Sequence, residues 1–143
     1  MRRLAVFAVA ATLAWPAQGF PVLRQTVTVP VVPISATEFE VVRASFTSPA
    51  NIWCGAGTYA RKVLGQRGGK LWVAQGLAPS KTVSGQKSMI FSTAPVTPDK
   101  TTYTYTLNED GVVKSTAAAT GACNLQGPLV FIEVQGKRFR ASL

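Results

Sequence analysis

Hydrophobic residues between positions 51 and 65 recur with the period of an α-helix. The residues that share one helical face at this spacing are Ile52, Ala56, Tyr59, Ala60, Val63 and Leu64. Asn51 is a candidate N-cap, and Gly65 or Gly68 can end the helix. The pattern therefore predicts one amphipathic helix that begins near Asn51 and buries a single face.

Most of the remaining chain has the short alternating or apolar runs that favour β-strands. We expect strands within residues 26–29, 37–46, 70–77, 88–94, 101–107 and 112–118, and a hairpin over residues 128–143 that turns near Gln135 and Gly136. Prolines on both sides of residues 26–29 favour an edge strand or an extended arm there. Together the elements predict an α+β fold, with one N-terminal helix packed on an antiparallel sheet of about five to six strands. A cystatin-like roll and a small barrel-like sheet both fit this order.

Residues 1–19 have the layout of a secretory signal peptide. Two arginines precede the apolar run Leu4–Trp15, and the small residues Ala17 and Gly19 suit a cleavage site before Phe20. The apolar run is 12 residues long, whereas a membrane span needs about 20. We therefore expect a single exported α+β domain over residues 20–143, with no transmembrane segment, in the periplasm or secreted.

The two cysteines, Cys54 and Cys123, are predicted to form a disulfide in an oxidising compartment. The bridge closes a loop of 70 residues (123 − 54 + 1), which the chain-entropy relation values at roughly 4.4 kcal/mol. Gly55 and Gly57 each cost a helix about 1 kcal/mol relative to alanine. We therefore expect another backbone segment, around Gly121 and Cys123, to pack closely against the helix at these glycines.

The absence of histidine from the sequence narrows the chemistry that this chain can perform. Histidine is the usual general base for serine and cysteine nucleophiles and the commonest zinc ligand, so we predict no enzyme, no metal and no cofactor. Ser84 and Lys87 match the Ser-x-x-Lys pattern of penicillin-binding enzymes, and a small hydrolase is the remote alternative. Glu38 and Glu40 share one face of a predicted strand, and we interpret that face as solvated rather than catalytic.

Positive charge is the remaining functional signal. Residues 20–143 carry 13 Lys and Arg (15 − 2) and 6 Asp and Glu, a formal charge of +7 (13 − 6). The basic residues that we select as candidate anion-binding groups are Arg61, Lys62, Arg67 and Lys70 near the helix end, and Lys137, Arg138 and Arg140 on the last hairpin. Were the two clusters to meet beside the aromatic residues Trp53, Tyr59, Trp72 and Phe139, they would form an anion-binding patch. The alternative is that the aromatics are core and the charges complement the helix dipole.

These observations favour a non-enzymatic binding or structural module for an anionic component of the cell envelope. The alternative is an inhibitor or accessory subunit of another periplasmic protein, which would dock through the predicted turn at residues 78–87. Nucleic acid stays among the candidate partners because its binding also depends on positive charge.

The stretch from Trp53 to Gly65, WCGAGTYARKVLG, resembles small exported proteins of unassigned function from alphaproteobacteria. The resemblance continues through LWVAQGLAPS and MIF and covers about 40 residues. It implies export, a disulfide and a Gram-negative origin, and it supplies no catalytic or binding residues.

Overall fold

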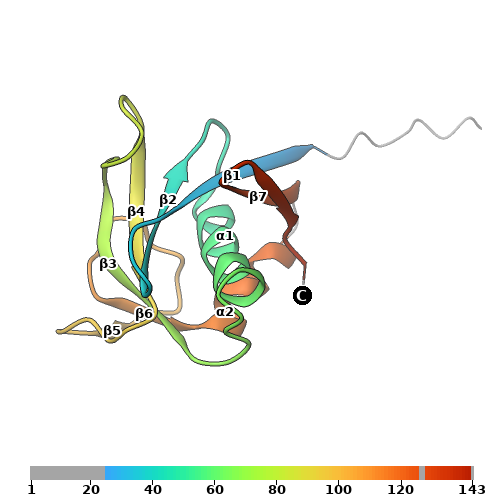
Figure 1. Cartoon of the computed structure of the whole chain (residues 1–143). Coiled ribbons are helices and arrows are strands. Elements are labelled where there is room, and N and C mark those ends of the chain that lie inside the picture. The colour runs from blue at the N-terminus through green and yellow to red at the C-terminus, as the bar shows by residue number, and fades with distance from the viewer. Residues whose placement is uncertain (1–24, 126–127, 143) are drawn as a thin grey trace, which may run out of the picture.

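The computed structural model describes residues 25–125 and 128–142, so the predicted signal peptide at residues 1–19 lies outside the described residues. One open eight-stranded sheet partly surrounds a central helix, α1 (Figure 1). The elements in chain order are β1 (Thr26–Pro33), β2 (Glu38–Arg43), α1 (Pro49–Lys62), β3 (Lys70–Pro79), β4 (Lys87–Ser92), β5 (Lys100–Thr101), β6 (Val112–Ser115), α2 (Thr116–Gly121), a 3-10 turn (Ala122–Asn124), β7 (Leu129–Val134) and β8 (Lys137–Arg140). The α+β class is confirmed, and within the described residues no helix is long and apolar enough to cross a membrane.

The sheet is larger than predicted and mixed rather than antiparallel. Its strand order is β5-β6-β3-β4-β2-β1-β7-β8, with parallel pairing of β1 to β7 and of β5 to β6. The expected edge strand β1 is therefore an interior strand. Residues 26–30 pair with β7 and residues 31–33 pair with β2, so β1 changes partner at Pro30. Proline has no N–H to donate, which suits this changeover between two ladders.

Helix α1 begins earlier than predicted, with an N-cap three residues before the candidate cap Asn51. The N-cap is Ser48, whose hydroxyl accepts a hydrogen bond from the Asn51 N–H at 3.2 Å, and Pro49 occupies the first turn. Proline is favoured there because its fixed φ is already helical and its missing N–H has no intrahelical partner. After Lys62 the chain leaves the helix, and Gly65 takes a left-handed φ of +71°. Gly65 thus follows the end of the helix, but Val63 and Leu64, which were predicted on its buried face, lie beyond Lys62 and are exposed.

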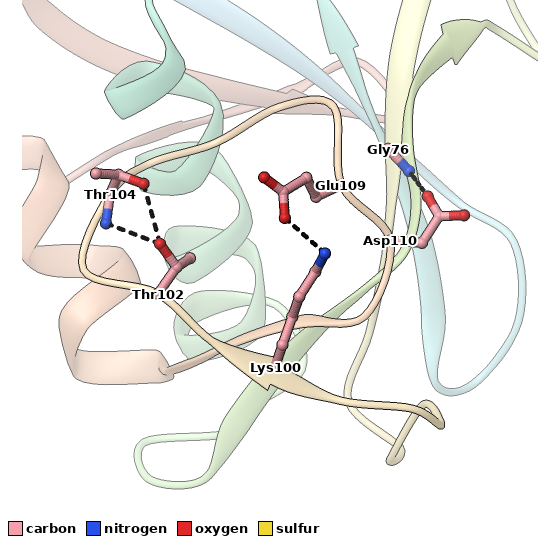
Figure 2. Close-up of polar contacts among 6 residues, drawn as sticks. All are labelled: Gly76, Lys100, Thr102, Thr104, Glu109 and Asp110. Carbon is pink, nitrogen blue, oxygen red and sulfur yellow. Dashed lines mark hydrogen bonds and ion pairs between the residues drawn. The ribbon is translucent and has the colours of Figure 1, made fainter.

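The predicted strand at residues 101–107 is wrong beyond Thr101, because this segment covers α1 instead of pairing. The Trp53 indole N–H donates to the carbonyl of Thr106 at 3.1 Å, and the Tyr105 hydroxyl donates to the carbonyl of Ala118. The close-up of this loop shows how its ends are held (Figure 2). Lys100 pairs with Glu109 at 2.6 Å, and Asp110 accepts from the backbone N–H of Gly76 at 2.6 Å.

The predicted strand at residues 112–118 ends at Ser115, where the second helix begins. The Ser115 hydroxyl accepts from the Ala118 N–H at 3.0 Å and caps α2. Serine is a favourable N-cap, and the alanines that follow have high helix propensity. The last predicted hairpin is confirmed as β7 and β8, which turn through Gln135 and Gly136 with positive φ at both residues.

The core lies between α1 and the inner face of the sheet. Trp53 is fully buried, and its ring packs edge-on to Phe91 at 5.0 Å between centroids. The predicted disulfide is confirmed: Cys54 of α1 and Cys123 of the 3-10 turn are bonded, with 4.8 Å between their Cα atoms. The bridge therefore joins the middle of α1 to the segment that follows α2.

The close packing predicted at the glycines of α1 is also present. A Cβ atom at Gly57 would lie 2.6 Å from the backbone nitrogen of Thr120 and 2.9 Å from the carbonyl carbon of Ala119. At Gly55 the neighbour is a side chain, Val29, whose Cγ1 would lie 3.1 Å from the added Cβ. Gly57 thus provides the backbone approach to α2 that the sequence predicts, whereas Gly55 provides space for a core valine.

Candidate functional site

The C-terminal end of α1 lies beside β8, but only the first of the two predicted basic clusters contributes positive side chains to the surface there. An open hollow of about 690 Å³, here called the basic hollow, is lined by Arg61, Lys62, Arg67, Phe139 and Ser142. The last turn of α1 supplies two of the cations, the loop after it supplies Arg67, and β8 supplies the aromatic wall. Arg67 and Ser142, which are 75 positions apart in the chain (142 − 67), thus line the same hollow.

Lys62 fixes the geometry of the basic hollow. Its ammonium donates to the backbone carbonyl of Arg140 at 2.5 Å and to the hydroxyl of Ser142 at 3.2 Å. These bonds join the end of α1 to the end of β8. They also use donors of Lys62 that a ligand would otherwise take, so Arg61 and Arg67 are the better candidates for direct anion contact.

The remaining predicted basic residues do not line the basic hollow. Arg138 lies over the Phe131 ring at 4.1 Å and donates to the Thr28 hydroxyl at 3.3 Å. Arg140 faces Lys62 through its backbone carbonyl, and Lys137 is exposed where β8 begins. Lys70 lines a different hollow, described below. The structure thus places three of the seven predicted basic side chains together.

Most of the four aromatic residues also lie away from the basic hollow. Trp53 and Tyr59 are buried in the core cluster, and Trp72 is also buried. Phe139 is partly buried and contributes to the wall of the basic hollow. The alternative that the aromatics are core is therefore correct for three of the four, and only Phe139 is placed to contact a ligand beside the cations.

The electrostatic surroundings of the basic hollow favour an anion. None of the six acidic residues is among the described side chains that line it. The one ion pair in the described part of the chain joins Lys100 to Glu109, so Arg61 and Arg67 have no carboxylate partner there. The negative end of the α1 dipole lies nearby; it stabilises the positive side chains and by itself opposes an anion, so attraction of an anion depends on Arg61 and Arg67.

A second hollow, of about 320 Å³, contains a buried lysine that the sequence did not single out. Lys114 of β6 donates to the carbonyl of Thr102 at 2.6 Å, and its ammonium lies 5.0 Å from the Tyr105 ring and 5.5 Å from the Trp53 ring. Burial lowers the pKa of Lys114. A lysine that directly follows two valines within a predicted strand was the available signal. Its contacts hold the loop over α1, which is a structural role.

Glu40, predicted on a solvated strand face, is instead fully buried at 0% exposure. Its carboxylate accepts hydrogen bonds from the Lys81 N–H at 2.9 Å and from the hydroxyls of Ser88 and Thr82. Burial alone would raise the pKa of Glu40, but the hydrogen bonds from Ser88, Thr82, Ser80 and Lys81 outweigh it and the pKa is lowered. The sequence could not reveal this, because strand alternation does not show that the β3–β4 connection folds over β2. The carboxylate fastens that connection.

Changing Glu40 to glutamine is expected to lower the free energy of unfolding at pH 7 by about 1–3 kcal/mol, because a neutral amide replaces a charged acceptor. The folded pKa lies below the unfolded value of 4.5. The stabilisation is therefore complete above pH 4.5 and is lost as the pH falls through the folded pKa. Urea unfolding at pH 7 and at stepwise lower pH should show a shallower acid loss for Glu40→Gln than for the wild type.

The matched control for this change is Glu38→Gln, whose carboxylate accepts no hydrogen bond from the described side chains. We expect it to alter the unfolding free energy at pH 7 by less than about 0.5 kcal/mol. Identical acid curves for the wild type and Glu40→Gln would contradict the assigned role of the Glu40 carboxylate.

No catalytic or metal-binding constellation is assembled in the described residues. Ser84 is exposed in the β3–β4 connection, and no hydrogen bond joins it to Lys87 there. No group of three or more His, Cys, Asp or Glu side chains that could hold a metal ion occurs in the part of the chain that the structure describes. The geometry thus gives no support to the Ser-x-x-Lys hydrolase alternative.

Comparison of the chain with protein-family models, with curated proteins and with solved structures finds no match.

Proposed function

We propose that this protein is a non-enzymatic binding module for a phosphorylated glycan of the cell envelope, and that the basic hollow is its binding site. The observation that carries the proposal is the convergence of Arg61, Lys62 and Arg67 on one hollow with Phe139, with no acidic side chain among its described lining residues. An exported, envelope location is part of the proposal and depends on residues 1–19 and on the resemblance to exported proteins.

The chemistry of the hollow suits such a ligand. An arginine side chain presents paired N–H donors that match two oxygens of a phosphate, and it is less strongly hydrated than lysine. Phe139 offers an apolar surface on which a sugar ring can pack, and a volume of about 690 Å³ lies within the usual range for ligand sites. Arg61 and Arg67 would bind the phosphates while Lys62 keeps β8 in place.

The direct test is calorimetric titration of the exported protein with deacylated lipopolysaccharide, which retains the phosphorylated sugars and lacks acyl chains. The double variant Arg61→Gln/Arg67→Gln is expected to bind about 10- to 100-fold more weakly, because two charge-assisted contacts are lost. Binding by the wild type should weaken as the salt concentration rises. Lys62 is left unchanged so that its bonds to β8 persist.

A matched control removes the same charge elsewhere. Arg43→Gln/Lys87→Gln lies beyond the opposite end of α1 and should leave the affinity within about twofold, because no contact in the hollow is lost. An equal loss for both double variants would show that only net charge matters and would refute the site. Salt-independent binding would refute the electrostatic basis of the proposal.

A further inference from the structure

Phe46, in the turn between β2 and α1, is the most exposed phenylalanine among the described side chains, with 96% of its surface accessible. Its backbone has a φ of +64°, in the left-handed region. Residues other than glycine and asparagine rarely adopt this conformation. A large apolar side chain is thus exposed to solvent at a position whose backbone conformation phenylalanine rarely adopts.

The turn presents Phe46 in a fixed direction. The Thr47 N–H donates to the carbonyl of Ala44 at 3.3 Å, and the Thr47 hydroxyl bonds to the same carbonyl. Phe46 occupies the third position of this four-residue turn, where a positive φ favours glycine. Neither the turn nor the core requires phenylalanine at this position, so its exposed ring is available for contact with another molecule.

Two positive side chains lie on one side of Phe46, and the residues described on the other side are uncharged. On one side a hollow of about 470 Å³ is lined by Arg43 and Lys87, which are partners across β2 and β4. On the other side a hollow of about 230 Å³ is lined by residues 25–27 of the β1 segment. None of the six acidic residues is among the described lining of either hollow. The β2–α1 turn and the β3–β4 connection project from the same end of the molecule (Figure 1).

We propose that this end of the molecule, here called the Phe46 end, docks on an anionic lipid bilayer. Phe46 enters the boundary between headgroups and acyl chains, and Arg43 and Lys87 bind lipid phosphates. Aromatic side chains beside basic residues are typical of proteins that lie on a membrane surface. Each basic residue near an anionic surface adds to the attraction.

A bilayer fits this end better than a protein partner does. Phe46 stands alone, between the polar residues Ser45 and Thr47, whereas a stable protein interface needs a contiguous surface of about 800 Å² on each partner. A fluid bilayer can receive a single projecting side chain without a complementary pocket. The proposal is independent of the basic hollow, because the two surfaces lie beyond opposite ends of α1.

The test is sedimentation of the exported protein with vesicles of phosphatidylcholine alone or with phosphatidylglycerol added. We expect partition into the anionic vesicles and little into the neutral ones. Phe46→Asn suits the left-handed φ, so the fold should be retained, and partition should fall about tenfold or more because the apolar side chain is lost. Arg43→Gln/Lys87→Gln should reduce it about 30-fold on anionic vesicles only, the equivalent of about 1 kcal/mol for each charge.

Two control variants distinguish binding through this surface from non-specific adsorption to vesicles. Tyr103→Asn removes another fully exposed aromatic, and Arg61→Gln/Arg67→Gln removes two charges at the basic hollow. Each should change partition less than threefold, because Tyr103 is uncharged and charges at the opposite end of α1 are largely screened from the bilayer by salt. Phe46→Trp adds an exposed reporter to the buried Trp53 and Trp72. Its fluorescence should shift to the blue and be quenched by brominated acyl chains.

Three outcomes would overturn the proposal. One is equal partition of the wild type and Phe46→Asn, and another is a Phe46→Trp reporter that brominated lipids do not quench. The third is failure to bind either vesicle while Phe46→Asn abolishes binding to an isolated envelope protein, which would assign the Phe46 end to a protein partner. None of these results depends on glycan binding at the basic hollow.

Discussion

Removing the disulfide by the double change Cys54→Ala/Cys123→Ala is expected to lower the free energy of unfolding by roughly 4 kcal/mol, the largest effect of any change considered. The bridge joins residues 69 positions apart, so its loss releases a long loop in the unfolded chain. It also releases the 3-10 turn after α2 from the middle of α1. A loss of this size approaches the total stability of many small domains.

Urea unfolding of the oxidised protein and the double variant measures this loss directly. A reducing agent should destabilise the wild type by a similar amount and leave Cys54→Ala/Cys123→Ala unaffected, which separates the bridge from side-chain packing. A difference below about 1 kcal/mol between the oxidised protein and the double variant would contradict a stabilising role for the bridge.

Gly57→Ala is expected to lower the free energy of unfolding by about 2 kcal/mol even though alanine is the better helix former. The added Cβ would lie 2.6 Å from the Thr120 nitrogen and 2.8 Å from the Thr120 hydroxyl oxygen. Overpacking of this kind costs about 1–3 kcal/mol or more, whereas the gain in helix propensity is about 1 kcal/mol. The neighbouring backbone cannot retreat easily, because Cys123 ties the segment after α2 to α1.

The control for this prediction is Gly121→Ala, the same change at the end of α2. A Cβ at Gly121 has no atom within 4 Å and the residue has a helical φ, so stability should stay equal or rise by up to about 1 kcal/mol. The free energies of urea unfolding of the two variants separate the gain from helix propensity, present in both, from the loss by overpacking, expected only at Gly57. A Gly57→Ala variant as stable as Gly121→Ala would refute the close approach of the two helices.

The sequence predicted well the elements whose local pattern agrees with their final packing. Apolar residues at a helical period marked α1, and the Gln135–Gly136 dipeptide marked the turn from β7 to β8. The strand predicted at residues 101–107 was wrong although its alternating threonines and tyrosines match a strand. The carbonyl of Thr106 accepts from Trp53 and the hydroxyl of Tyr105 donates to Ala118, and these contacts hold the segment over α1. Tertiary contacts, which a local sequence pattern does not contain, thus determined the conformation of that segment.

The candidate site was predictable in part. The prediction required the two basic clusters to meet, and the structure brings only Arg61, Lys62 and Arg67 together beside Phe139 of the last hairpin. That Arg138 would instead stack on Phe131 depends on strand register, which the sequence did not specify. The exposure of Phe46 was not predicted, because nothing in its sequence neighbourhood indicates a positive φ. Phe46 stands two residues before the pair Ser48 and Pro49, a helix-start signal that indicates a connecting turn there.

The change of partner within β1 at Pro30 affects the order in which the domain can be completed. The chain emerges N-terminus first, so residues 26–30 exist long before their parallel partner β7 has been made. Until Leu129–Val134 arrives, the front half of β1 lacks its β7 partner and only residues 31–33 can pair, with β2. Non-local pairing of this kind slows folding. The first strand of the domain is thus among the last to be fully paired.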